Sequence, residues 1–464
     1  MVKLVDTPDL GSGAARYVGS SPILGIFVKI VFLCCFCAPA YPSAYHPLDL
    51  IVPERGDIMA KYIYARHREM RVESDWALDL YASHLRVWNG FFESDPLKEN
   101  LADFIRDFHA LLNSIKAQGF NPAHSVLPIN PYGEICNGGH RVASCLLYNH
   151  DLFCREDECE GVRAFWTLEY FRLCGLEEKH LDAMALQYCE LKKDTYIVHV
   201  FPAATSDEWV IEDILREHGG IVYSKAIWLS DEGALNLIKE LYEGEAWLGT
   251  TENHFSGARW KANLCFPEAQ IATTPLRVYL FSCQNLEKAV QCKRKIRALF
   301  DLGNHSAHVN DTHAESVAIA RIVFNQNSIH LLNHRKPGHF ERFESLLKEY
   351  KAWIKKTGAD SDCFCIDGSA TLAAYGLRDC RDLDYLQHGY EDLPVPSSGI
   401  NNHHEELKHH VFTKDDIIFN PENHFYYKGI KMATLSVVKG MKQNRGEPKD
   451  ITDIKLVDAL LSEK

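Results

Sequence analysis

The sequence predicts an α/β protein assembled from three successive modules, and three local patterns lead to this prediction. Residues 194–330 alternate apolar, strand-like runs with amphipathic, helical stretches. Gly138-Gly139 separates a strand-like run from a helical one, and Gly368-Ser369 does the same near the C-terminus. Such alternation is typical of helices packed on sheets. Because 464 residues exceed what one hydrophobic core usually covers, two to four domains are expected.

The net charge and the cysteine content of the chain indicate which binding partners and which cellular compartment to expect. The net charge of −13 argues against a general nucleic-acid binder, because affinity for nucleic-acid phosphates rests on a basic excess. Fifteen cysteines without a repeating spacing do not indicate a disulfide framework in so long a chain. We therefore expect reduced thiols, a cytoplasmic protein and no clear nucleic-acid partner.

Residues 1–45 are expected to lie outside the folded modules. Residues 22–40, PILGIFVKIVFLCCFCAPA, form an apolar run that ends in small residues, as a signal peptide or a membrane anchor does. Lys29 interrupts this run, and residues 2–22 resemble the peptide obtained by translating through a bacterial tRNA gene. A misassigned start is the favoured interpretation and a signal or anchor is the alternative. No membrane partner is expected unless this stretch is genuine.

Residues 48–150 form the first predicted module. A helix is predicted from residue 101, with apolar side chains on one face and an end at Gly119. The segment SVLPINPYGEICNGGHRVASCLLY then predicts two strands, a glycine loop and a helix. Gly138 and Gly139 expose amides at a helix start, which favours an anion, and Arg141 can grip a phosphate with two hydrogen bonds. The alternative is an ordinary strand-to-helix turn with a surface arginine.

The order strand, NGGHR, helix resembles the ParB/sulfiredoxin superfamily, in which the glycine loop and the helix start hold nucleotide phosphates. The resemblance implies a phosphate or nucleotide site at Gly138, Gly139, His140 and Arg141. His140 stands where the redox members carry cysteine, so sulfiredoxin chemistry is not expected. Residues 151–193 then predict a helical connector.

Residues 194–330 predict the β-α-β-α order of a ferredoxin-like sandwich. Over this section the chain resembles nucleoside diphosphate kinases, and His308 takes the place of their phosphate-carrying histidine. The matching positions are Phe201-Pro202-Ala203, Gly219-Gly220, Lys225, Tyr242, Ile296-Arg297, His308, Asp311, Thr312 and Glu315. The family's phosphate-binding lysine is replaced by Phe201, and its Gly-Ser after the histidine is replaced by Val309-Asn310. These departures predict a degenerate, kinase-like scaffold.

Three interpretations of the His308 region stay open. A neutral imidazole is a competent nucleophile near pH 7, so His308 could accept a phosphate. In the favoured alternative, Asp311 or Thr312 caps the next helix, Glu315 completes a capping box and His308 is a polar rim residue. A metal site is the weakest option, because no cysteine or second cluster supports it; its ligands would be His305, His308, His313 and Glu315.

The final section, residues 339–464, contains the most informative pattern, CFCIDGSATLAAYGLRDCRDLDYL. It predicts a strand, a Gly368-Ser369 turn, an apolar helix and a second strand that carries Asp382 and Asp384. Alternate residues of a strand share a face, so both carboxylates point the same way. Two converging carboxylates suit Mg²⁺ that carries a nucleoside triphosphate, and a Gly-Ser turn lets backbone amides approach the phosphates.

This ordered pattern resembles the signature of polymerase-beta-like nucleotidyltransferases, with one departure at Asp367, where an apolar residue normally precedes the glycine. The family uses a third carboxylate on a later strand. Asp416, directly before a predicted apolar strand, is the first choice, and Asp415 and Glu422 are the alternatives.

The C-terminal tail, with the pattern K…R…KD..D, resembles minimal and abortive-infection-type nucleotidyltransferases. The resemblance implies that the phosphates and the fold are supported by Lys442, Arg445, Lys449 and Asp450. The histidine-rich run HHEELKHH, residues 403–410, is predicted to be a solvated helix or loop rather than a metal site.

These patterns predict a Mg²⁺-dependent nucleotidyltransferase that moves a nucleoside monophosphate from an NTP, ATP being the first choice, to an unknown acceptor. Gly368 and Ser369 would cradle phosphates, and the metal would be held by Asp382, Asp384 and Asp416. One alternative is a small-molecule kinase centred on the first module. The other is a non-catalytic, nucleotide-gated binding protein of the partition type.

Overall fold

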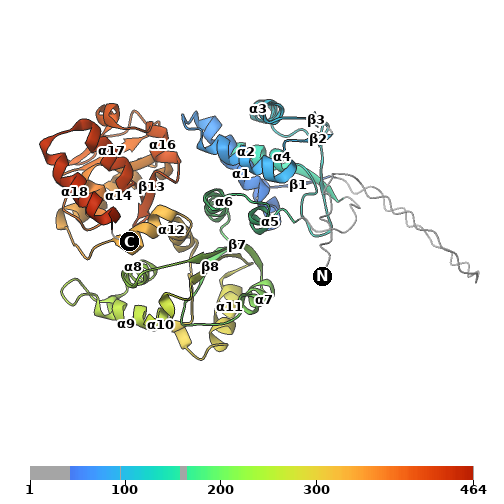
Figure 1. Ribbon diagram of the computed structural model, residues 1–464. Coiled ribbons are helices and arrows are strands. Elements are labelled where there is room, and N and C mark those ends of the chain that lie inside the picture. Colours follow the sequence, from blue (N-terminus) through green and yellow to red (C-terminus); the bar gives the residue numbers. More distant parts are fainter. Residues whose placement is uncertain (1–41, 95, 157–164, 463–464) are drawn as a thin grey trace, which may run out of the picture. The chain divides into compact units, whose positions relative to one another are not determined.

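The computed structural model describes residues 42–94, 96–156 and 165–462, which form a mixed α/β structure (Figure 1). The apolar run predicted at residues 22–40 lies outside the described residues. None of the helices within the described ranges combines the length and the apolar content that a bilayer crossing demands. Each cysteine in these ranges is a free thiol.

The first section surrounds a small sheet of order β1-β5-β4 with helices. Strand β5 pairs antiparallel with β1 and parallel with β4. The helix predicted from residue 101 is confirmed: Asn100 caps its start and Gly119 ends it. The second predicted strand is reduced to one bridge between Ile129 and Ile135. The elements are β1 (Ser43–Tyr45), η1 (Pro47–Leu50), α1 (Asp57–Met70), α2 (Trp76–Asn89), β2 (Glu93–Ser94), β3 (Leu97–Lys98), α3 (Leu101–Gln118), β4 (Leu127–Ile129), α4 (Gly139–Tyr148), β5 (Leu152–Glu156), α5 (Leu168–Leu173) and α6 (Glu178–Leu191).

The middle section is built on an antiparallel sheet of order β7-β8-β6-β9. Every residue of β6 is buried, because both faces of the sheet are covered. The elements are β6 (Thr195–Val200), α7 (Glu208–Arg216), β7 (Gly220–Ile227), α8 (Asp231–Leu241), η2 (Ala246–Leu248), α9 (Ser256–Cys265), α10 (Glu268–Ile271), β8 (Leu276–Ser282), α11 (Leu286–Ala298), η3 (Gly303–His305), β9 (Ala307–Val309), α12 (His313–Val323) and α13 (Gln326–His334).

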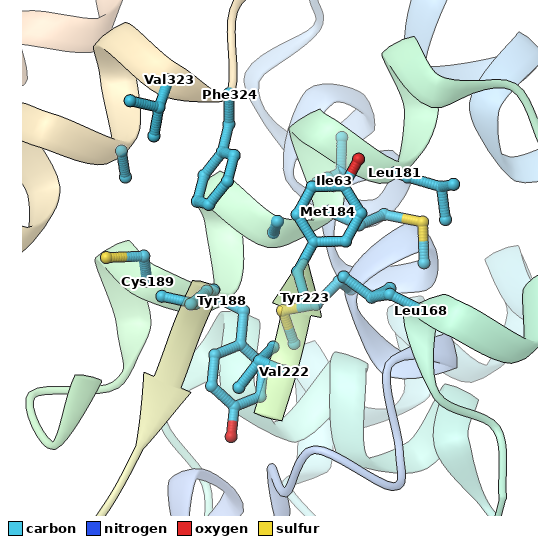
Figure 2. Close-up of a cluster of buried hydrophobic side chains, with 14 of the residues drawn as sticks. Ile63, Leu168, Leu181, Met184, Tyr188, Cys189, Val222, Tyr223, Val323 and Phe324 are labelled. Carbon is cyan, nitrogen blue, oxygen red and sulfur yellow. The ribbon is translucent and has the colours of Figure 1, made fainter. Parts of the chain in front are cut away.

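Alternating residues of β6 divide between two hydrophobic clusters. Val198 and Val200 pack with residues of α7 and α11 in one cluster. Ile197 belongs to the other, which also contains residues of α1, α5, α6 and α12. Figure 2 shows part of this second cluster, with Val222 and Tyr223 of β7 beside Met184 and Tyr188 of α6. The period-2 pattern of the strand therefore produces two cores.

The last section contains a mixed sheet of order β12-β11-β10-β14-β13 and its own hydrophobic cluster. Strand β10 pairs antiparallel with β11, and this register places Asp367 directly opposite Asp384. The elements are α14 (Glu341–Thr357), η4 (Ser361–Cys363), β10 (Phe364–Asp367), α15 (Ser369–Ala374), β11 (Leu383–Gln387), β12 (Ile400–Asn402), η5 (His404–His409), α16 (Lys414–Phe419), β13 (His424–Tyr427), β14 (Ile430–Ala433), α17 (Leu435–Arg445) and α18 (Pro448–Ser462).

The prediction of a strand after Asp416 is wrong, because residues Lys414–Phe419 form helix α16. Thr413 accepts a hydrogen bond from the Asp416 amide, and the Asp416 carboxylate accepts one from the Thr413 amide. This capping box starts a helix, and it outweighs the β-propensity of the isoleucines that follow.

A largely buried ion-pair network joins residues that lie far apart in the sequence. Arg321 of α12 donates to Glu190 Oε1 of α6 and to Asp362 Oδ1 of η4, both at 2.9 Å. Arg66 of α1 donates to Asp360 Oδ2 at 2.7 Å and lies 3.6 Å from Asp362 Oδ2. Burial would raise the pKa of Asp362, but the cations beside it, Arg321 first, hold that pKa below its ordinary value.

We expect Arg321→Met to lower the free energy of unfolding by about 2–4 kcal/mol, because it leaves the largely buried carboxylates of Glu190 and Asp362 without their shared cation. The matched control is Arg259→Met, whose partner Glu232 and own side chain are both nearly half exposed, and which should change stability by about 1 kcal/mol or less. Urea unfolding of both variants measures the difference. Equal, small losses would contradict the structural role of this network.

Candidate active site

A cavity of about 610 Å³ lies in the last section, at the end of strand β11 where Asp382 and Asp384 are located. Its walls come from the turn between β10 and α15, from β11, from His403 and Glu406, and from helices α17 and α18. The lining includes seven residues that the sequence predicted for a common site: Gly368, Ser369, Asp382, Asp384, Lys442, Arg445 and Lys449.

The carboxylates lie on one face, as the strand period predicts. Leu383 is fully buried between them, whereas Asp382 and Asp384 are partly exposed to the cavity. Gly368 has φ +69°, and a Cβ at this position would lie 3.1 Å from Asp384 Oδ2. A side chain at residue 368 would therefore be strained and would crowd the carboxylate, so glycine allows the turn to approach Asp384.

The charge at the two carboxylates fits a divalent cation. Burial raises the pKa of Asp384, and its neighbour Asp382 raises it further, whereas His403 lowers it. Within the described residues, neither Asp382 nor Asp384 forms an ion pair with a lysine or an arginine; the charged contact of Asp384 is with His403, at 4.0 Å. Paired carboxylates without a protein cation are a suitable donor set for Mg²⁺, which prefers oxygen ligands.

The predicted cations of α17 are committed to carboxylates of α18. Arg445 donates to both oxygens of Asp450, at 2.7 and 3.0 Å, and to Glu406 at 3.2 Å. Lys442, which is buried, lies 3.3 Å from Asp450 and 2.8 Å from Asp453. Arg378 donates two hydrogen bonds to Asp453 at 2.5 and 2.6 Å. These residues form a charge lattice that ties α17, α18 and the cavity wall together.

Two other cations line the cavity and remain exposed. The Lys449 side chain is 68% exposed and pairs with Glu447 at its surface. Arg381, which is also exposed, immediately precedes Asp382. Sequence reasoning missed Arg381, although a basic residue next to the Asp-Leu-Asp strand was a usable signal. Both side chains are available to an anionic ligand.

The structure does not bring the predicted third carboxylates to the cavity. Asp416 forms the capping box of α16, and it is not among the described residues that line the cavity. Asp415 accepts a hydrogen bond from the Glu73 amide at 2.6 Å and contacts His388 at 2.9 Å. Glu422 lies 3.3 Å from Lys179 and lines a different cavity.

Two histidines that the sequence assigned to a solvated segment are instead tied to the core. The segment between them is the short helix η5, and His403 and His410 flank it. Both histidines contact Asp367, the residue that departs from the expected apolar position before Gly368. No local pattern indicates this contact, because it joins residues separated by more than thirty positions.

Comparisons with family models, curated proteins and solved structures give no match for this chain. Geometry and charge alone therefore point to the chemistry of this cavity.

The glycine loop of the first section is occupied by the chain's own side chains. Gly138 has φ +106°, and α4 begins at Gly139, as predicted. The Arg141 guanidinium packs against Gly138 and donates to Ser125. His140 is partly buried; it shares a 2.8 Å hydrogen bond with Tyr81, and desolvation holds its pKa well below the ordinary value. A Cβ at Gly139 would lie within 3 Å of Asp57 and Lys61, so the start of α4 faces a buried ion pair.

His308 lies on β9, opposite His199 of β6. Burial lowers its pKa to about 3, with smaller contributions from Lys293 and Arg297, so it is neutral at pH 7. Of the capping interpretation, the cap itself is confirmed: Thr312 caps α12 by accepting a hydrogen bond from the Glu315 amide. The capping box is not formed, because the Glu315 carboxylate accepts from the Asp311 amide rather than from that of Thr312.

The remaining expectations for the middle section concern a metal site and Lys225. Within the described residues, the proposed ligands His305, His308, His313 and Glu315 do not form a metal-ligand group. Lys225, one of the kinase-like positions, pairs with the buried Asp182 at 2.5 Å. This pairing gives Lys225 a structural partner within the chain.

We expect Asp450→Ala to lower the free energy of unfolding by about 3–5 kcal/mol at neutral pH, because Lys442 and Arg445 would lose a buried counter-ion. Burial alone would raise the pKa of Asp450, but these cations lower it to about 2. The stabilisation should therefore be present above about pH 4 and be lost as the pH falls towards 2.

The control for this prediction is Asp458→Ala on the same helix. The Asp458 side chain is 50% exposed and pairs with Lys439, so its removal should cost about 1 kcal/mol or less. Urea unfolding at neutral and acidic pH measures both variants. Similar losses at neutral pH, or a pH-independent difference, would show that the lattice is not what stabilises these helices.

Proposed function

We propose that the last section, residues 339–464, is a Mg²⁺-dependent nucleotidyltransferase that transfers a nucleoside monophosphate from an NTP, ATP being the first choice. One observation carries the proposal: a single cavity gathers the Gly368-Ser369 turn, the Asp382/Asp384 pair and exposed cations. Its volume of about 610 Å³ is within the range of roughly 300–1,000 Å³ that small-molecule sites occupy.

The distribution of charge supports a triphosphate ligand. Asp382 and Asp384 are the residues that would hold Mg²⁺, which offsets the phosphate charge and orients the reacting groups when it is bound. Arg381 and Lys449 are exposed cations on the same cavity and would attract the phosphates. The lattice of Lys442, Arg445 and their carboxylates would hold this wall in place rather than contact the ligand first.

The turn at Gly368 would position the phosphate chain. Because residue 368 has no Cβ, its backbone can lie against Asp384 and against a phosphate at the same time. In the proposed reaction, an acceptor oxygen forms a bond to the α-phosphorus. The bond from that phosphorus to the oxygen that bridges to the β-phosphate breaks, and pyrophosphate leaves.

The strand orders support the fold relationships that the sequence suggested. An antiparallel sheet of order β7-β8-β6-β9, with α7 and α11 on one face, supports a ferredoxin-like, kinase-related scaffold. The antiparallel β10–β11 pair, which carries the turn at one strand end and the acids on the other strand, supports the nucleotidyltransferase fold. A ParB-like relationship of the first section is supported by the glycine loop at the start of α4.

We expect Asp382→Asn and Asp384→Asn each to reduce Mg²⁺-dependent pyrophosphate release from NTPs by about a hundredfold or more. A metal ion lowers the free energy of a phosphoryl-transfer transition state by several kcal/mol, and each change of about 1.4 kcal/mol in the activation free energy changes the rate tenfold. Asp392→Asn, in an exposed turn, is the matched control and should retain full release. If the wild type releases pyrophosphate and both site variants do so at the same rate, the cavity is not the active site.

A further inference from the structure

A second cluster of potential ligands lies behind the carboxylate pair. Asp367 ends strand β10, and His403 and His410 flank η5. All three side chains are buried, with exposures of 0% for Asp367 and His410 and 10% for His403. His403 Nδ1 lies 2.7 Å from Asp367 Oδ2, and His410 Nε2 lies 2.9 Å from the same oxygen. One ligand atom from each residue lies within 4.8 Å of the others.

The hydrogen bonding of this cluster is incomplete. His403 and Asp367 form a hydrogen bond. By contrast, Asp367 Oδ1 and both ring nitrogens of His410 have no hydrogen-bond partner among the described residues, although they are buried. The 2.9 Å contact of His410 with Asp367 therefore lacks hydrogen-bond geometry. Buried polar atoms without a partner destabilise the folded state, so such a cluster calls for a ligand that satisfies them.

We propose that Asp367, His403 and His410 bind a divalent first-row transition metal ion, with Zn²⁺ as the first candidate. Two imidazoles and one carboxylate are a donor set that zinc uses when it keeps a fourth position open. Imidazole nitrogen favours zinc and its neighbours over Mg²⁺, which prefers oxygen ligands. This site is thus chemically distinct from the Asp382/Asp384 pair, and it does not rest on the proposed nucleotidyltransferase activity.

The site also has an outer partner that faces the cavity. If Nδ1 of His403 binds the metal, its other ring nitrogen, Nε2, lies 4.0 Å from Asp384 Oδ2. A carboxylate that accepts a hydrogen bond from the far nitrogen of a metal-bound histidine orients its ring and is a recurring feature of zinc sites, and Asp384 would have to move closer to His403 to take this role. The metal would also fix both ends of η5, whose Glu406 contacts Arg445 in the charge lattice. It would thereby hold one wall of the cavity against β10.

The test is a titration of the metal-free, full-length protein with Co²⁺, whose visible d–d absorption reports its coordination. Saturating Mg²⁺ is present throughout, so that the Asp382/Asp384 pair is not free to bind Co²⁺. We expect the wild type to bind one equivalent of Co²⁺ with an intense spectrum of low coordination number, and Zn²⁺ to displace it. Absence of stoichiometric Co²⁺ binding by the folded wild type overturns the proposal, whatever the variants do.

Variants then assign the ligands. Loss of an outer partner of a metal ligand typically weakens metal binding about tenfold to a hundredfold, so loss of a ligand should do at least as much. We therefore expect Asp367→Asn and His410→Ala each to weaken Co²⁺ binding by about a hundredfold or more. Each variant should also abolish the rise in melting temperature on adding Zn²⁺. His409→Ala, which changes the neighbouring histidine, is the matched control and should bind as the wild type does. Wild-type affinity in both ligand variants overturns the assignment. Because pyrophosphate release is not measured, failure here is separate from failure of the proposed function.

Discussion

The pairing of β10 with β11 places two acidic residues, Asp367 and Asp384, directly opposite each other, and the rest of the site is arranged around this constraint. Opposed residues of an antiparallel pair project to the same face, and like charges in such positions repel. The structure meets this cost with His403, which hydrogen-bonds to Asp367 and lies 4.0 Å from Asp384. Gly368 adds room, because no Cβ crowds the Asp384 carboxylate. The cavity thus combines concentrated negative charge with imidazole and cations nearby.

The cations around the cavity separate into two kinds by their partners. Lys442 and Arg445 are bound by Asp450 and Asp453 and belong to the fold of α17 and α18. Lys449 and Arg381 are exposed and are open to a ligand. The sequence prediction did not separate the cations of the tail, and assigned support of the phosphates and of the fold to all of them together. The contacts distinguish residues that build the wall from residues that can meet an anion, and this distinction follows from burial and pairing rather than from residue type.

Local chemistry decided which parts of the site were predictable. The positions of Asp382, Asp384 and Gly368 follow from the strand period and from the need for a glycine in a tight turn, so the sequence was sufficient. The prediction of Asp416 as the third carboxylate was wrong, because a Thr413–Asp416 capping box starts a helix where the apolar residues suggested a strand. His403 and His410 were assigned to a solvated segment because their partner, Asp367, is distant in sequence and only the tertiary fold brings them together. Asp367 itself was noticed as a departure from the pattern, but its reason lies in these contacts.

The most direct test of the nucleotidyltransferase account uses two labelled forms of the same NTP with Mg²⁺ and candidate acceptors. If the cavity transfers a nucleoside monophosphate, label at the α-phosphate appears on the acceptor, whereas label at the γ-phosphate appears only in pyrophosphate. Transfer of the γ-label to an acceptor, with the α-label retained in a nucleoside diphosphate, would contradict it and would identify a kinase instead.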